Sequence, residues 1–207
     1  LRAIFYPDGF EFPLQIIPDK IYMTEIVREI CTIVMLLSLA WIAGKNRLQK
    51  FAWFLLSFGI WDIFYYVALK LFLGWPESLL TWDILFFFFF TWVGPVLVPV
   101  ICSIFMIFLS VAILLVQSKN RNFNFQKIDW LLIFSGFFSI FLSFIWNYSK
   151  LMVSNDLLIK MFIPNDYNAF KEILLNYIPG RFFWELFIPG IVLIGMDIIT
   201  TFKKYYK

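Results

Sequence analysis

The stretch "ILFFFFFTWVGPVLVPVICSIFMIFLSVAILLV", residues 84–116, decides the fold class, because it runs for thirty-three residues without a charged side chain. A straight helix rises about 1.5 Å per residue, so one of this length would reach roughly 50 Å, whereas the hydrocarbon core of a bilayer is about 30 Å thick. The Gly94-Pro95 dipeptide is where such a helix would break. We therefore expect an aromatic segment over 84–92, re-entrant or lying at the interface, followed by a kinked membrane span over 93–117.

The composition of the whole chain leads to the same class. Of the 207 residues, 62% are hydrophobic and 15% are charged, and the mean hydropathy is +0.83. A soluble domain is about half apolar and about a quarter charged. The sequence therefore predicts an all-α integral membrane protein with about five transmembrane helices. The expected spans are 25–44, 51–73, 93–117, 130–148 and 182–202.

Two segments are expected outside the bilayer. Residues 1–22 are punctuated by prolines and form an extramembrane lead-in on the outer side, whereas residues 23–207 form a single transmembrane domain. The longest connection between spans has apolar and aromatic side chains on one helical face over about 166–178. This pattern is typical of a short helix lying on the bilayer surface, and we expect an interfacial helix there, with Asp166 as its N-cap.

The basic residues indicate the orientation, because cytoplasmic loops carry an excess of lysine and arginine. With five spans, the basic loops all fall on one side, and most of the acidic residues fall on the other. We therefore place the C-terminus in the cytoplasm and residue 1 outside, which makes the acidic, aromatic outer surface a docking face for another protein. The basic residues on the cytoplasmic side are Lys45, Arg47, Lys50, Lys119, Arg121, Lys127, Lys203, Lys204 and Lys207.

The chain contains no histidine, and this restricts its chemistry. Without imidazole it cannot ligate haem b or build a His-containing zinc site, and Ser-His and Cys-His nucleophiles are impossible. The two cysteines, Cys31 and Cys102, are too few for an iron–sulfur cluster. We therefore expect no cofactor, with a bound lipid left open. The small, scattered net charge of +3 does not favour nucleic acid, so the expected partners are other membrane subunits and the bilayer.

Asp62 lies near the middle of the second expected span, inside "FGIWDIFYYVALK" (58–70). A charged side chain at the bilayer centre costs roughly 2.5–3.5 kcal/mol, so Asp62 must face the bundle interior. It either makes an interhelical hydrogen bond that fixes packing, or serves as a proton or ion relay or a ligand anchor. We favour packing, because a relay needs several protonatable groups in series and the sequence predicts only one deep carboxylate.

The neighbours of Asp62 follow from helical spacing. Tyr65 and Tyr66 lie one turn away, and Lys70 lies a further turn along. Arg28, on the first span near the same end, is a second candidate counter-ion. The predicted intramembrane polar site comprises Asp62, Tyr65, Tyr66, Lys70, Arg28 and Glu29.

The other acidic residues are expected at membrane boundaries. Trp82-Asp83-Ile84 repeats the letters of Trp61-Asp62-Ile63, and we expect Asp83 at the outer boundary, where water lowers the cost of its charge. Asp197 lies within reach of the terminal lysines. Two boundary ion pairs are predicted from helical spacing, Glu25 with Arg28 and Arg181 with Glu185.

Several short motifs carry a resemblance. Arg28-Glu29 followed by "TIVML", then "FGIWDIFYY", "GWPESLLTWDILF" and "WVGPVLVPV", resembles a family of uncharacterised bacterial polytopic membrane proteins over residues 24–105. The resemblance implies the bacterial inner membrane and no particular reaction. The family has a proline between the "DILF" and "WVGP" elements, whereas phenylalanines stand here at 86–90, which removes the residue that would set a sharp turn.

The sequence favours a non-enzymatic role. Our leading hypothesis is a cofactor-free accessory subunit of a larger bacterial membrane complex, with an energy-transducing complex as the first choice. The alternative is a small transporter or proton-coupled channel that uses Asp62 and the broken third span. A third hypothesis is a lipid-modifying enzyme at the outer interface, acting through Glu25, Glu29, Glu77 and Asp83.

Overall fold

The computed structural model describes residues 19–86, 92–120, 123–154 and 178–205. Within these ranges five helices are long and apolar enough to cross a membrane. The prediction of an all-α membrane protein with five spans is confirmed. The helices are α2 (Asp19–Ala43), α3 (Arg47–Leu73), α4 (Leu97–Lys119), α5 (Lys127–Ser154) and α8 (Trp184–Tyr205).

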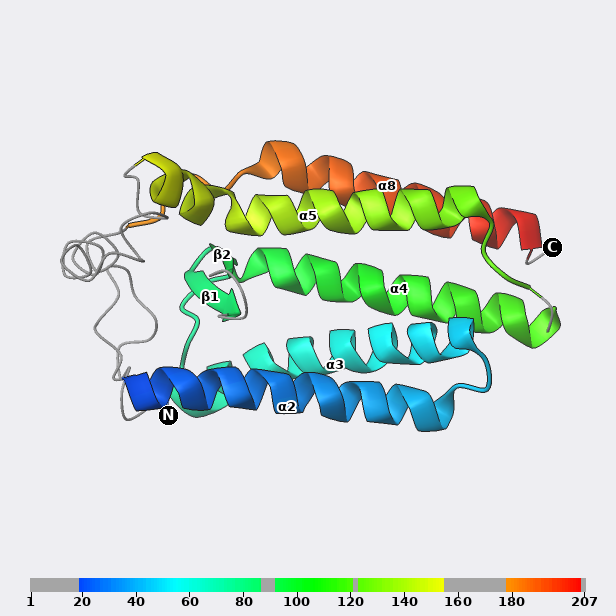
Figure 1. The fold of residues 1–207 in the computed structure, drawn as a ribbon, viewed down its shortest axis with the longest axis horizontal. Coiled ribbons are helices and arrows are strands. Elements are labelled where there is room, and N and C mark those ends of the chain that lie inside the picture. Colours follow the sequence, from blue (N-terminus) through cyan, green and yellow to red (C-terminus); the bar gives the residue numbers. More distant parts are fainter. Residues whose placement is uncertain (1–18, 87–91, 121–122, 155–177, 206–207) are drawn as a thin grey trace.

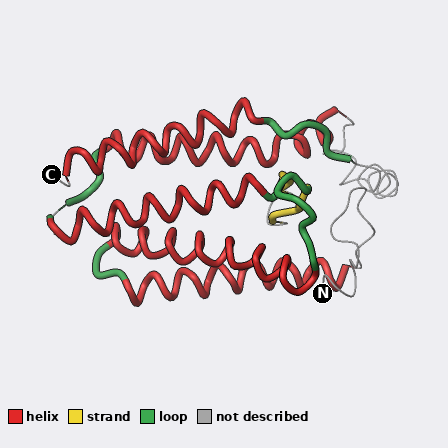
Figure 2. Tube along the Cα trace, turned by 180° about the vertical axis from the view of Figure 1, so that it is seen from behind, coloured by secondary structure: helices red, strands yellow, loops and turns green. Residues whose placement is uncertain are grey.

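The helices form an elongated bundle in which successive helices run in opposite directions (Figure 1). The most extensive contacts join α3 to α4 and α5 to α8, and α2 packs against α3. A small antiparallel hairpin lies at one end of the bundle, beside the start of α4 (Figure 2). We call this the hairpin end. The first described residue, 19, therefore lies at the hairpin end, and the last, 205, lies at the opposite end.

Local capping residues set the length of α3. The helix begins after Asn46, whose side chain accepts a hydrogen bond from the Gln49 amide at 2.9 Å, and it ends at Gly74. Gly74 has a φ of 71°, which is the left-handed conformation that glycine adopts readily at a helix end. The second span thus starts four residues before the predicted residue 51. The first helix also begins early, at Asp19, so the last four residues of the predicted lead-in are helical.

The predicted third span is present as α4, but the prediction that it starts at residue 93 as a kinked helix is wrong. Strand β2 (Trp92–Pro95) pairs antiparallel with β1 (Trp82–Phe86), and α4 begins only at Leu97. Aromatic and β-branched residues favour this extended backbone. Pro95 has no backbone N–H, so it could not donate the hydrogen bond that a helix running through Gly94 would need. The other proline, Pro99, falls in the first turn of α4, where a missing N–H leaves no helical hydrogen bond unmade.

The hairpin is joined to the chain around it by backbone hydrogen bonds. The Val96 amide donates to the Thr81 carbonyl at 3.0 Å, and the Leu97 amide donates to the Leu79 carbonyl at 2.7 Å. These bonds hold the segment after α3 against the start of α4. The centre of the predicted aromatic segment, the rest of the lead-in (1–18) and almost all of the predicted interfacial helix at 166–178 lie outside the described residues.

Two glycines allow α5 and α8 to approach closely. A Cβ atom on Gly190 would lie 2.8 Å from the Gly136 carbonyl oxygen, and one on Gly136 would lie 2.8 Å from the Gly190 carbonyl oxygen. Nearby, the Ser139 hydroxyl donates to the Leu186 carbonyl at 2.6 Å, in the turn that Pro189 interrupts. Small residues and hydroxyl groups are the usual means of helix contact in membranes, where no hydrophobic effect drives helices together.

Replacing Gly190 by valine is expected to destabilise the bundle by about 1–3 kcal/mol, because the new side chain would force the α5 backbone away. The measurement is the thermal unfolding midpoint of the detergent-purified protein. Gly180→Ala is the matched control, since a Cβ there meets nothing within 4 Å. Equal midpoints for the two variants would contradict the close approach.

Candidate functional site

A cavity of about 800 Å³ lies among α2, α3, α4, α5 and the hairpin. Its walls are mostly aromatic and aliphatic, and its polar side chains come chiefly from α2, α3 and β1. Five of the six predicted site residues line it, and Lys70 does not. The lining residues used below are Glu25, Arg28, Glu29, Phe58, Trp61, Asp62, Tyr65, Tyr66, Ala68, Asp83, Trp92, Ser103, Phe141 and Phe144.

Asp62 makes an interhelical hydrogen bond. Its side chain is 8% exposed, and it accepts a hydrogen bond from the Ser103 hydroxyl of α4 at 2.7 Å. One turn earlier, a Cβ on Gly59 would lie 2.8 Å from the Ser103 carbonyl oxygen, so a glycine is needed for the two backbones to come this close. The contact that the packing interpretation requires is therefore present.

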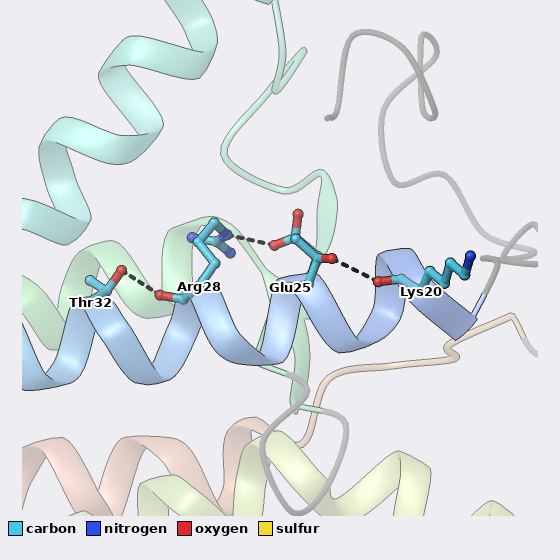
Figure 3. Close-up of polar contacts among 5 residues, drawn as sticks. Lys20, Glu25, Arg28 and Thr32 are labelled. Carbon is cyan, nitrogen blue, oxygen red and sulfur yellow. Dashed lines mark hydrogen bonds and ion pairs between the residues drawn. The ribbon is translucent and has the colours of Figure 1, made fainter.

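Neither predicted counter-ion pairs with Asp62. The Lys70 ammonium donates to the carbonyls of Gly74 and Pro76, at 3.0 and 2.7 Å. The chain turns sharply after α3 and brings these carbonyls within reach, so the lysine extends toward the helix end rather than into the bundle. Arg28 instead forms the predicted pair with Glu25, with 2.6 Å between Nε and Oε2 (Figure 3).

Asp83 of the second Trp-Asp-Ile copy is also buried in the protein, so it lacks the contact with water that the sequence analysis expected, whereas its position at the membrane boundary stays a prediction. Asp83 is 1% exposed and accepts a hydrogen bond from the Tyr66 hydroxyl at 3.0 Å. The hairpin folds β1 against the bundle, and this places Asp83 in the cavity wall. Tyr66 lies one turn from Asp62 on α3. Its hydrogen bond therefore holds the Asp83 carboxyl of β1 at the same site as the Asp62 carboxyl.

Aromatic rings line the cavity on two sides. On α3 the Trp61 ring lies between Phe58 and Tyr65, with centroid distances of 5.9 and 5.6 Å, and it stacks on Tyr65 at 18°. We call these three side chains the aromatic ladder. Across the cavity, Trp92 of the hairpin packs on Phe141 and Phe144 of α5, at 5.1 and 5.8 Å.

The remaining acidic residues are divided between the cavity and other places. Glu25, Glu29 and Asp83 line the cavity, but Glu77 is exposed outside it, so the set suggested for a lipid-modifying enzyme is not brought together. The boundary pair of Arg181 with Glu185 is confirmed at 2.6 Å. Within the described ranges, no group of three or more acidic residues or cysteines is placed to hold a metal ion. The expectation that no cofactor binds is not tested by this and stays a prediction.

Asp197 is a further buried carboxyl, outside the cavity, whose burial the sequence did not predict. It is 0% exposed, and neither oxygen has a hydrogen-bond partner in the described part of the chain. The Thr201 hydroxyl, one turn along α8, is buried in the same way. The predicted pairing with the terminal lysines is wrong for Lys203, because Asp197 points into the helix packing and Lys203 points out to the exposed surface.

Comparison with known proteins found no family model, no curated protein and no solved structure that matches this chain. The site must therefore be interpreted from its own geometry.

Replacing Ser103 by alanine is expected to destabilise the protein by about 0.5–2 kcal/mol, the range of interhelical hydrogen bonds in membranes. The variant leaves the buried Asp62 carboxyl without its donor. The measurement is the free energy of unfolding in a denaturing detergent. In the control, Ser118→Ala, the hydroxyl that is removed donates to the Leu115 carbonyl of its own helix. A loss no larger than that of the control would refute the interhelical role.

Replacing Asp197 by valine is expected to raise the free energy of unfolding by about 1–3 kcal/mol, since it removes a buried polar group that has no partner. The same unfolding assay measures it. Asp129→Val is the control, and it is expected to lower the free energy of unfolding, because Asp129 accepts a hydrogen bond from the Gln126 amide at 2.6 Å. A destabilised Asp197→Val variant would show that the carboxyl binds a group that stabilises the fold.

Proposed function

We propose that the protein binds an amphipathic small molecule within the membrane and acts as a small transporter for it. The observation that carries this proposal is the cavity, whose volume of about 800 Å³ falls in the range of roughly 300–1,000 Å³ typical of small-molecule sites. Its apolar walls would contact the body of the molecule. Asp62, Tyr66 and Asp83 would contact its polar head.

The position of the hairpin supports this proposal. Transporters often form their substrate sites from interrupted helices, and irregular backbone is tolerated in a membrane protein where it is buried or lines a cavity. Here the hairpin stands where the sequence predicted an aromatic segment and the start of a kinked third span, and Asp83 and Trp92 from its two strands line the cavity. The interruption therefore contributes side chains to the site.

The proposed location is the inner membrane of a bacterium, with the hairpin end outside. The connections α2–α3 and α4–α5 and the end of α8 share the opposite end of the bundle (Figure 1). Basic residues gather there, and the positive-inside rule favours the cytoplasm for this end. In this orientation the cavity lies toward the outer half of the membrane. The described basic residues at the cytoplasmic end are Lys45, Arg47, Lys50, Lys119, Lys127 and Lys203.

An accessory subunit of a larger membrane complex is the second proposal. The hydrogen bond between Ser103 and Asp62 favours it, because a buried polar pair that joins two helices serves a structural role without any transported substrate. A subunit of this kind could also hold a lipid in the cavity. Gentle detergent extraction tests the proposal, and migration only as a free monomer would count against it.

The transport proposal is tested by filling the cavity. Ala68 lines it, so Ala68→Trp is expected to expel a bound molecule, whereas Val67→Trp, on the exposed side of the same helix, should leave it in place. Native mass spectrometry of protein purified from its own membrane should show one small molecule per chain in the wild type and in Val67→Trp. An empty wild-type chain, or equal retention in Ala68→Trp, would refute the proposal.

A further inference from the structure

Acidic side chains of the cavity wall make their contacts within the protein itself. Glu25 pairs with Arg28 at 2.6 Å (Figure 3). Asp83 accepts a hydrogen bond from Tyr66 at 3.0 Å. These contacts give no reason to expect a charged ligand. We propose that the molecule bound here is a phenolic lipid, with a hydroxyl group on a planar aromatic ring as its head and a long apolar chain as its tail. This inference rests on the proposed binding function.

Asp62 is the acceptor for the hydroxyl of the head. Its Oδ2 atom receives the hydrogen bond from Ser103 at 2.7 Å, and Asp62 is 8% exposed and lines the cavity. The two oxygens of a carboxylate can together accept about four hydrogen bonds, so Ser103 leaves capacity for a donor on the ligand. A hydrogen bond from a hydroxyl to a carboxylate is short and strong. A phenol makes this bond without bringing a charge into the membrane.

The aromatic ladder lies beside this acceptor. Trp61 directly precedes Asp62 on α3 and stacks on Tyr65 at 18°, and both rings line the cavity. On another side of the cavity, Trp92 stacks on Phe144 at 26°. Aromatic rings pack on one another in offset-stacked or edge-to-face arrangements. A planar aromatic head would therefore pack against these rings while its hydroxyl reaches Asp62, whereas a puckered saturated ring would make poorer contact.

The rest of the cavity wall suits a hydrocarbon tail. Its apolar lining includes Leu69 of α3, Met106 of α4 and Ile140 of α5. Hydrophobic contact with such side chains is non-directional, so the tail adds affinity without selecting one molecule over another. Selectivity then comes from the head, through the acceptor and the aromatic faces. The two parts of the head can be tested separately.

Three probes share a dodecyl tail and differ in the head. Para-dodecylphenol has the aromatic ring and the hydroxyl, para-dodecylanisole has the ring without the donor, and para-dodecylcyclohexanol has the hydroxyl without the aromatic ring. Each probe is titrated at neutral pH into the detergent-purified protein, and native mass spectrometry gives the dissociation constant, with Ala68→Trp as the blank for non-specific binding. The phenol is expected to bind at least tenfold more tightly than either of the others. A tenfold difference corresponds to about 1.4 kcal/mol.

Two variants assign each part of the head to a side chain. Asp62→Asn keeps an acceptor for Ser103 but replaces a carboxyl oxygen, so the preference for the phenol over the anisole should fall to about threefold, because a bond to a neutral acceptor is roughly half as strong. Trp61→Leu should lower the preference for the phenol over the cyclohexanol and leave the preference over the anisole unchanged. This second variant keeps the test decisive if Asp62→Asn does not fold. The control is Glu185→Gln, which removes an exposed carboxylate outside the cavity and should leave both preferences unchanged.

The outcomes separate this inference from the function on which it rests. If no probe binds and no molecule co-purifies with the protein, the binding function itself fails. If the anisole or the cyclohexanol binds as tightly as the phenol, and Ala68→Trp abolishes the binding of both, the cavity is a binding site and the phenolic head is overturned. Tighter binding of para-dodecylbenzylamine, which is protonated at neutral pH, would overturn the hydroxyl head in the same way. Unchanged preferences in both Asp62→Asn and Trp61→Leu would also overturn the inference.

Discussion

The hydrogen bond from Ser103 to Asp62 is the contact on which the site depends. It lies where Gly59 lets the backbones of α3 and α4 approach, so a polar contact and a small residue act at one crossing point. This crossing aligns the cavity-facing side of α3 with the start of α4. The hairpin lies between these two helices in the chain, and it brings Asp83 against Tyr66. The positions of Asp62, Ser103, Tyr66 and Asp83 in the cavity are thus linked through this helix contact.

Local pattern was sufficient for the spans and for the burial of Asp62 inside the bundle. Long apolar runs predicted the five membrane-length helices of the described residues, and helical spacing predicted that Tyr65 and Tyr66 share the site with Asp62. These features depend on hydropathy and on the 3.6-residue period, both of which a single sequence contains. The pair of Arg28 with Glu25 was predictable for the same reason.

Contacts between distant segments could not be predicted in this way. The burial of Asp83 depends on the pairing of β1 with β2 and on the docking of both against the bundle, and two copies of the same three letters gave no sign of this. Ser103 looked like an ordinary small residue in an apolar run. Lys70 was assigned to Asp62 because its spacing allowed it, whereas the turn at Gly74 offers it closer carbonyls. Which group a side chain binds depends on the three-dimensional geometry, and the spacing of residues along a helix does not determine it.

The two glycine crossings divide the bundle into two tightly joined pairs, α3 with α4 and α5 with α8. The cavity lies at the seam between them, since α3 and α4 form one of its sides and α5 forms another, while α8 does not line it. Along this seam the contacts are made by side chains such as Trp92, Phe141 and Phe144 rather than by backbone against backbone. Widening the cavity therefore means separating rings along the seam, and it leaves both glycine crossings intact.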